Sequence, residues 1–301
     1  MMFGTQEPFG YFLCGACETL QIVDALEGDE LVRHYPPAYH SSNAGPAGIF
    51  RWLIAQHDHF KLRSGGRILG ALASAPLPDG FLRAITGGDV IKMIAQLGIA
   101  REMRILDVGC GAGALLERLA RVGFTNLVGV DIFIAADGET PSGVPLLKRD
   151  LSEVIEQFDL IMLNHSLEHV PDPIATLKLV REKLSVGGIC LARVPTTSSD
   201  AWDIYQADWV QIDAPRHTVI PSRRGMELAA DRAGFLVEKT FDDSTLGQFM
   251  GSEAYRRGIA VTDPKMFRMF GPKQIWAWER RADALNREDR GDQAGFVLRA
   301  N

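Results

Sequence analysis

The 301-residue sequence predicts an α/β fold in which helices cover both faces of a seven-stranded, mostly parallel sheet. Short apolar segments alternate with helical segments across residues 101–244, and this alternation is typical of parallel strands joined by helices. A glycine turn, Gly-Cys-Gly-Ala-Gly at 109–113, joins the first strand to its helix. Such a turn brings backbone and a helix N-terminus close to a ligand. The two observations together predict a nucleotide-type binding domain.

The strands follow from apolar runs bounded by turn residues. We expect them at 104–108, 127–131, 146–149, 159–163, 189–194, 236–241 and 295–299. The helix after the first strand has leucines at helical spacing and ends at Gly123. A second helix begins at Asp172-Pro173, because proline fits the first turn, and ends at the double glycine 187–188. Ser222 is expected to cap the helix before the sixth strand.

The segments around this core complete the organisation. Residues 1–40 contain a short hairpin, and residues 41–100 are expected to be mainly helical. Residues 245–292 are too long for a hairpin loop, so we expect a helical insertion that serves as a lid or a dimer contact. Residues 293–301 then supply the final strand.

Two cysteines lie between the strands of the N-terminal hairpin. Cys14 and Cys17 have the C-x-x-C spacing of a zinc knuckle. A structural zinc site needs four ligands, and a second cysteine pair is missing, because Cys110 and Cys190 fall in the nucleotide-binding core. A zinc-binding hairpin, a metal-free hairpin and a start codon placed too late all remain open.

Composition excludes several classes of function. A formal charge of −6 gives no support for nucleic-acid binding, which usually needs a basic face. No apolar run is long enough to span a membrane, and the N-terminus lacks the pattern of a signal peptide. Four cysteines in a chain of this length indicate a reducing compartment, so we expect a cytoplasmic protein.

The identity of the ligand depends on an acid at the end of the first strand. Gly109, Gly111 and Ala114 satisfy the dinucleotide pattern only loosely. Asp107 would repel a pyrophosphate but attract a cationic amine, such as the amino group of S-adenosylmethionine. Asp131 ends the next strand and could accept hydrogen bonds from two ribose hydroxyls, although an NAD site would use the same residue. An NAD-dependent Rossmann enzyme is therefore an alternative.

At this point the sequence resembles the class I S-adenosylmethionine-dependent methyltransferases. The resemblance rests on 107–113, Asp131, Asp150, 158–172 and 184–189, in the order and spacing of that family. It implies a Rossmann-like fold and methyl transfer, with Asp150 accepting a hydrogen bond from the adenine amino group. The expected cofactor contacts are Asp107, Gly109, Cys110, Gly111, Gly113, Asp131, Ile132, Asp150, Leu151, Asn164 and His165.

Methyl transfer to a hydroxyl or carbon acceptor would profit from a general base. His217 is the leading candidate, with Asp213 orienting its ring and Arg216 binding a phosphate or carboxylate of the acceptor. The alternative is that Arg216 forms a structural ion pair. His169 is the second candidate base.

The acceptor is expected to be a small molecule. The sequence resembles bacterial methyltransferases that have an N-terminal zinc-knuckle-like region and are linked to saccharide modification, which implies a sugar or nucleotide-sugar acceptor. Tyr205 and Trp209 could stack on such an acceptor, although aromatic residues are more often part of a core. A non-catalytic S-adenosylmethionine-binding or scaffold protein remains an alternative, and a homodimer is an open expectation.

Overall fold

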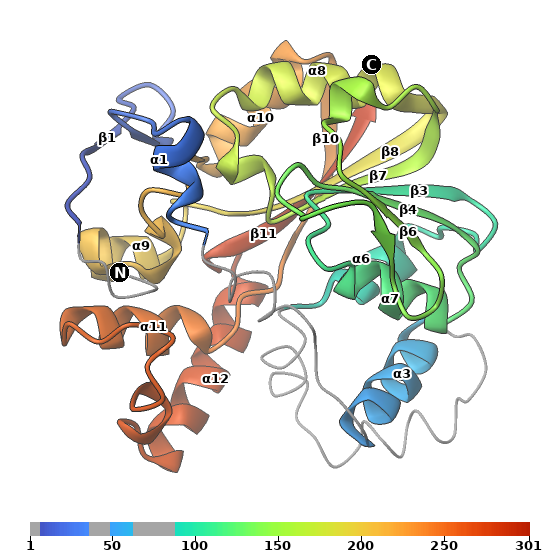
Figure 1. Ribbon diagram of the computed structural model, residues 1–301. Coiled ribbons are helices and arrows are strands. Elements are labelled where there is room, and N and C mark those ends of the chain that lie inside the picture. The colour runs from blue at the N-terminus through green and yellow to red at the C-terminus, as the bar shows by residue number, and fades with distance from the viewer. Residues whose placement is uncertain (1–6, 36–48, 63–87) are drawn as a thin grey trace.

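The computed structural model describes residues 7–35, 49–62 and 88–301, and a central sheet of eight strands runs through it (Figure 1). The strands lie in the order β10-β11-β8-β7-β3-β4-β6-β5. Their bounds are β3 Arg104–Val108, β4 Asn126–Val130, β5 Gly138–Glu139, β6 Pro145–Leu147, β7 Phe158–Asn164, β8 Leu184–Pro195, β10 Phe235–Asp242 and β11 Gln293–Ala300.

The strand directions confirm a mostly parallel sheet. β4, β3, β7 and β8 run parallel, and β6 pairs parallel with β4. β11 pairs antiparallel with both β8 and β10, so the last strand of the chain lies inside the sheet rather than at its edge. All seven predicted strands are present. The additional strand β5 has only two residues and pairs antiparallel with β6, which is too short a run to give a sequence pattern.

The prediction that a helix ends at the double glycine 187–188 is wrong. Helix α8 (Pro173–Lys183) ends earlier, and β8 begins directly at Leu184, so both glycines lie within the strand. The pairing between β7 and β8 shifts its register here, between Phe158 and Leu160. A Cβ at Gly188 would lie 2.9 Å from the Ser185 carbonyl oxygen, so the glycine serves close backbone packing in an irregular strand.

Helices cover both faces of the sheet, as predicted (Figure 1). α6 (Val90–Gln96) and α7 (Ala114–Arg121) pack on one face, and α8 and α10 (Arg223–Arg232) pack on the other. α3 (Ile49–Lys61) packs on α6 and α7, where buried Asp58 forms an ion pair with Arg118. Of the range 41–100 that was predicted to be mainly helical, the described part contains α3 and α6, and 41–48 and 63–87 lie outside the described residues.

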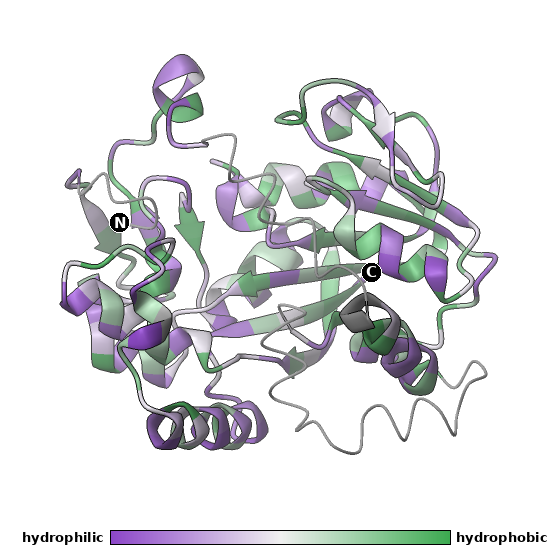
Figure 2. Ribbon diagram, turned by 60° about the horizontal axis from the view of Figure 1, so that its bottom comes forward, coloured by the Kyte–Doolittle hydropathy of each residue, from purple (hydrophilic) through white to green (hydrophobic). Residues whose placement is uncertain are grey.

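Local sequence signals explain where the helices begin. Pro173 lies in the first turn of α8, and Asp172 accepts a hydrogen bond from the Ala175 amide at 2.9 Å. Ser222 caps α10 by accepting from the Gly225 amide at 2.8 Å, as predicted. The helices alternate hydrophobic and hydrophilic segments, and the central strands are largely hydrophobic (Figure 2). This pattern places the main core between the sheet and its two helical layers.

A second core joins segments from the two ends of the chain. The predicted hairpin is present as β1 (Tyr11–Leu13) and β2 (Leu20–Ile22), and β9 (Val219–Ile220) extends it to three strands. The predicted insertion is helical, with α11 (Gly247–Arg256) and α12 (Pro272–Arg287). The insertion packs with α9 (Asp200–Tyr205) and the hairpin around a cluster of Leu20, Ala201, Tyr205, Trp209, Ile220, Phe249, Ala282 and Leu285.

Short helical turns complete the described part. They are α1 Gly28–Val32, η1 Leu151–Glu153, η2 Leu167–His169, η3 Gln206–Asp208, η4 Val210–Ile212 and η5 Met266–Arg268. Among the described residues, no helix has the length and apolar character needed to cross a membrane.

Candidate functional site

The glycine turn lies at the carboxyl end of β3, packed between two other segments. Gly109 and Gly113 have φ angles of 76° and 73°, which residues with a side chain rarely adopt. A Cβ at Gly109 would lie 2.5 Å from the Ser166 Cβ, and one at Gly113 would lie 2.7 Å from the Thr140 side chain. Gly111, with a φ of 52°, donates its amide to an oxygen of Asp131 at 2.9 Å. Glycine is therefore required at this turn by conformation and by space.

Asp107 places a buried carboxyl group beside this turn. The side chain is 3% exposed, and its Oδ1 has no hydrogen-bond partner among the described residues. Burial, together with the nearby charge of Asp131, raises the pKa of Asp107 to about 8. Ser166 also has a buried hydroxyl oxygen without a partner in the described part. Buried polar groups are normally paired, so two such atoms beside a glycine turn indicate a ligand with polar groups of its own.

Asp131 and its neighbour face the other end of the turn. Oδ2 of Asp131 accepts from the Gly111 amide, and Oδ1 accepts from the Phe133 amide at 2.7 Å. These two bonds fix the plane of the carboxylate while each oxygen retains a further lone pair. Ile132 is half exposed and offers an apolar surface beside it. Contact of Asp131 and Ile132 with a cofactor stays a prediction.

Three other expected cofactor contacts have structural roles of their own. Asp150 caps η1 by accepting from the amide and hydroxyl of Ser152, and these hydrogen bonds outweigh the opposing effect of burial and lower its pKa. Leu151 is buried in the main core. The Cys110 amide donates to the Val130 carbonyl, and burial raises the pKa of the thiol. Contact of Asp150, Leu151 and Cys110 with a cofactor stays a prediction.

Asn164 ends β7 and His165 follows it, and both lie next to Ser166 at the glycine turn. Asn164 Oδ1 accepts from Arg193 at 3.1 Å, and the His165 amide donates to the Arg193 carbonyl at 2.8 Å. His165 has a φ of 54° and its Nδ1 lies 3.1 Å from Glu168 Oε1. Burial and the Arg193 charge lower the pKa of His165, so its ring is neutral near pH 7. Both residues are held where they could face the methionine end of a cofactor.

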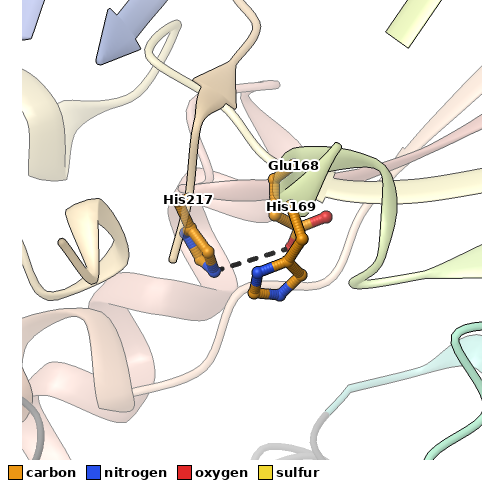
Figure 3. A group of neighbouring side chains, drawn as sticks. All are labelled: Glu168, His169 and His217. Carbon is orange, nitrogen blue, oxygen red and sulfur yellow. Dashed lines mark ion pairs between the residues drawn. The ribbon is translucent and has the colours of Figure 1, made fainter. Parts of the chain in front are cut away.

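Glu168, His169 and His217 form a buried cluster in which the three side chains face one another (Figure 3). Glu168 and His169 come from η2, and His217 precedes β9. His217 Nδ1 lies 2.6 Å from the Gln211 carbonyl oxygen, which can only accept, so Nδ1 carries the proton of the neutral ring. The lone pair is then on Nε2, which lies 4.0 Å from Glu168 Oε1 and 3.9 Å from Asp213 Oδ2.

The protonation states within the cluster differ. Burial and the neighbouring His217 lower the pKa of His169 to about 4, so its ring stays neutral. Burial disfavours the ionised form of Glu168, but the hydrogen bond from His165 and the nearby imidazoles outweigh it and lower the pKa to about 2. Glu168 therefore carries a negative charge beside His217, which can stabilise an imidazolium at that ring.

Metal binding has two candidate positions. The ligand atoms of Glu168, His169 and His217 lie within 4.8 Å of one another, and they are the one such group in the described part of the chain. However, His169 Nδ1 lies 3.0 Å from the Arg216 carbonyl oxygen, and Figure 3 shows this nitrogen as the one that faces His217. The nitrogen that a shared ion would need is thus engaged in donating to the backbone.

The N-terminal cysteines form half of a possible zinc site. Cys14 and Cys17 are free, and hydrogen bonds from the backbone amides of Ala16 and Cys17 lower the pKa of Cys14. Within 7–35, 49–62 and 88–301, the structure brings no third histidine, cysteine or carboxylate ligand to them. Zinc binding by this pair stays a prediction.

Two of the expected catalytic and acceptor residues, Arg216 and Asp213, are paired with each other. Arg216 and Asp213 are buried and form an ion pair with two hydrogen bonds, and Arg216 also donates to the His34 carbonyl at 2.9 Å. This is the structural ion pair that the sequence left as the alternative. It fixes the loop before His217, and it leaves the Arg216 charge neutralised within the protein rather than presented to an acceptor.

Trp209 and Tyr205 likewise belong to the second core. Trp209 is fully buried, and its Nε1 donates to Asp292 at 3.2 Å. Tyr205 is 6% exposed, and its hydroxyl donates to Glu253 at 3.3 Å. Neither ring has a free face for an acceptor, so the core alternative replaces the expected stacking role.

Sequence reasoning missed two residues of this region. Glu168 lies next to an identified histidine, and its signal was a carboxylate three residues after His165 at the strand end. Ser166 had no signal, because only the folded chain places its side chain against Gly109.

Comparison with known proteins shows similarity to methyltransferases. Residues 83–240 match a family model described as a methyltransferase domain. A ubiquinone biosynthesis O-methyltransferase of Azorhizobium caulinodans is 30% identical over 188 residues, which cover 56% of this chain and 73% of that protein. One of Cereibacter sphaeroides is 35% identical over 128 residues, which cover 38% of this chain and 51% of that protein. With several of these relatives, the match thus spans about half of the relative's length.

One solved structure aligns with this chain at low sequence identity. The cyclopropane synthase of Mycobacterium tuberculosis superposes with a TM-score of 0.47 at 18% identity, covering 74% of this chain and 86% of that one.

Proposed function

Because the chain belongs to the methyltransferase-domain family, we propose that it transfers a methyl group from S-adenosylmethionine to a hydroxyl oxygen of a small molecule. The observation that carries this proposal is the buried Asp107 carboxyl group, whose Oδ1 has no partner within the described residues. A positively charged amino group would satisfy that oxygen. A pyrophosphate, as in NAD, would instead keep this acid in its protonated form and would repel its ionised form at short range.

The residues around the glycine turn suit the three parts of this cofactor. Asp107 and Ser166 would hold the amino-acid end, and Asp131 would accept hydrogen bonds from the ribose hydroxyls. Ile132 would cover one face of the adenine. When bound, S-adenosylmethionine supplies a methyl group that is already activated by its positive sulfur. The protein's tasks are then to align the acceptor, to exclude water and to take up a proton.

His217 is the base in this proposal. Its Nε2 can accept a proton because Nδ1 is fixed as a donor to the Gln211 carbonyl. The imidazolium that forms would be stabilised by Glu168 Oε1 at 4.0 Å and Asp213 Oδ2 at 3.9 Å. His169 packs edge-on against the His217 ring with centroids 4.7 Å apart, which limits its rotation. Asp213 and Glu168 thus act through His217 rather than on the acceptor.

The chemistry of the base favours an acidic hydroxyl. A phenol has a pKa of about 10, whereas aliphatic sugar hydroxyls are far less acidic, so proton transfer to an imidazole is easier from a phenol-like group. The relatives named for ubiquinone biosynthesis are O-methyltransferases, which supports an oxygen acceptor. The sugar or nucleotide sugar implied by the sequence resemblance is the second acceptor class in the proposal.

The test is the formation of S-adenosylhomocysteine from S-adenosylmethionine with a panel of phenols, catechols and nucleotide sugars. The proposal expects turnover with at least one hydroxyl compound and faster turnover with the phenolic class. Binding of the cofactor without turnover of any member would favour a sensor or scaffold. A panel in which only nucleotide sugars react would contradict the phenolic assignment.

A further inference from the structure

A buried ion pair between Arg193 and Asp243 lies beside the proposed cofactor site. Arg193 is 2% exposed on β8 and Asp243 is fully buried just after β10. Arg193 Nε donates to both oxygens of Asp243, at 3.1 and 2.8 Å. In the sheet, Arg193 is the direct neighbour of Asn164 at the end of β7. A buried ion pair is weak evidence for stability, because the cost of removing two charges from water is large.

One side of this pair holds the segment that packs on the glycine turn. Arg193 donates to Asn164 Oδ1 at 3.1 Å, and its backbone carbonyl accepts from the His165 amide at 2.8 Å. Ser166 follows directly, and its side chain occupies the space where Gly109 has no Cβ. Displacement of Arg193 would therefore move residues 164–166, the segment against which Gly109 packs.

The other side of the pair holds the start of helix α6. Oδ2 of Asp243 accepts from the Asp89 amide at 2.7 Å, directly before Val90 begins the helix. Gly88 has a φ of 131°, and a Cβ there would lie 2.1 Å from Arg193 and 2.2 Å from the Asp243 carboxylate. Contacts this short cannot occur, so the fit requires glycine. The backbone of Gly88 therefore lies in direct contact with the ion pair.

We propose that Gly88, Arg193 and Asp243 are positioning residues for the cofactor, because together they fix Asn164, His165 and Ser166 against the glycine turn. The inference rests on the proposed use of S-adenosylmethionine. None of the three residues needs to touch the cofactor. They act by keeping α6 and the end of β7 in one arrangement, so that the polar groups facing the methionine end are already in place before binding.

The test compares Gly88→Ala with the matched control Gly98→Ala. Gly98 follows the same helix α6 and has a φ of 67°, but a Cβ there meets nothing within 4 Å. Both changes add one methyl group at a positive φ, and only the change at Gly88 presses on the ion pair. Asp243→Asn is the second variant, since it keeps the shape of the side chain and removes its charge.

Binding of S-adenosylhomocysteine is measured by calorimetry on the full chain below the unfolding temperature of each variant, which thermal unfolding establishes. The expected result is a Kd raised about tenfold or more in Gly88→Ala and Asp243→Asn, the effect of losing one hydrogen bond to a charged group, with little change in Gly98→Ala. Equal Kd values in all folded variants would overturn the inference. Failure of the unmodified chain to bind would instead reject the proposed function.

Discussion

Asp107 lowers the folding stability of the ligand-free protein near neutral pH, and its proposed role in binding explains why such a residue is present. A carboxyl group with a pKa raised from 3.8 to about 8 favours the folded state only while it is protonated. As the pH rises from about 4 toward 8, the unfolded chain loses this proton first, so the contribution of Asp107 to stability falls. A group that destabilises the empty site is expected where ligand binding needs a charge.

The change Asp107→Asn should therefore stabilise the free chain increasingly as the pH rises. We expect its free energy of unfolding, relative to the unmodified chain, to be higher at pH 8 than at pH 5 by at least about 1.4 kcal/mol, the value of one pKa unit. Urea unfolding at the two pH values measures this difference. Asp24→Asn, at an exposed position, is the control and should show no such trend. A pH-independent effect of Asp107→Asn would contradict the raised pKa.

Removal of the proposed base should affect turnover and leave cofactor binding intact. His217→Gln is expected to lower kcat by about 10²-fold or more, because general base catalysis typically contributes this much. The Kd for S-adenosylhomocysteine should not change, since the base faces the acceptor. His59→Gln on α3 is the matched control. Turnover unaffected by the change at His217 would remove it from the mechanism.

At the residue scale, the sequence predicted the residues of the glycine turn better than those of the acceptor side. Asp107, Gly109 and Gly113 lie close together in the chain, so local spacing alone determines how they are placed relative to one another. Trp209 has no such local constraint, because its partner Asp292 lies far along the chain and forms a buried hydrogen bond with it. Arg216 lies only three residues from its partner Asp213, but the spacing alone does not distinguish an ion pair between them from binding of an acceptor by Arg216.

At the scale of elements, the second core gives Trp209, which follows β8, a structural role. Trp209 Nε1 donates to Asp292, a buried carboxyl group whose pKa is raised to about 6 mainly by burial. Asp292 lies directly before Gln293, the first residue of β11. The indole therefore connects the segment before β9 to the last strand of the sheet.

The change Trp209→Phe should thus reduce stability rather than acceptor binding. Loss of the donor leaves an oxygen of Asp292 without its partner, at an expected cost of about 1–3 kcal/mol. The midpoint of urea unfolding measures this cost, and the acceptor KM should stay constant in the same preparations. Trp276→Phe, at a half-exposed site on α12, provides the comparison. A raised KM without loss of stability would restore the stacking role.

Elements with a continuous pattern were predictable, and those made by distant pairing were not. The apolar runs of β3, β4, β7 and β8 are long enough to identify a strand. β9 has two residues and exists only because it pairs with β2, about two hundred positions earlier in the chain. The double glycine at 187–188 led to a wrong helix end. Glycine often follows the last turn of a helix, but here both glycines lie within an irregular strand.

At the scale of the whole molecule, the N-terminal hairpin supports the proposed acceptor site. The Tyr11 hydroxyl donates to the His217 carbonyl at 2.8 Å, and Thr197 donates to the Glu18 carbonyl at 2.7 Å. The first strand of the chain is in this way tied to the loop that carries the base. The helical insertion covers the other side of the same second core.

The change Tyr11→Phe should consequently reduce turnover without altering the glycine turn. Loss of one neutral hydrogen bond of about 0.5–1.5 kcal/mol predicts a kcat lowered roughly two- to tenfold. The Kd for S-adenosylhomocysteine should be unchanged, as measured by calorimetry. A raised Kd with constant kcat would place the hairpin's influence on the cofactor side instead.

The most direct measurement is calorimetric titration of the unmodified chain and Asp107→Asn with S-adenosylmethionine and with NAD. We expect the unmodified chain to bind S-adenosylmethionine and not to bind NAD. We expect Asp107→Asn to weaken the binding of S-adenosylmethionine by about tenfold or more, since a hydrogen bond to a charged group is lost. Binding of NAD, or undiminished binding of S-adenosylmethionine by Asp107→Asn, would contradict the central role given to this buried acid.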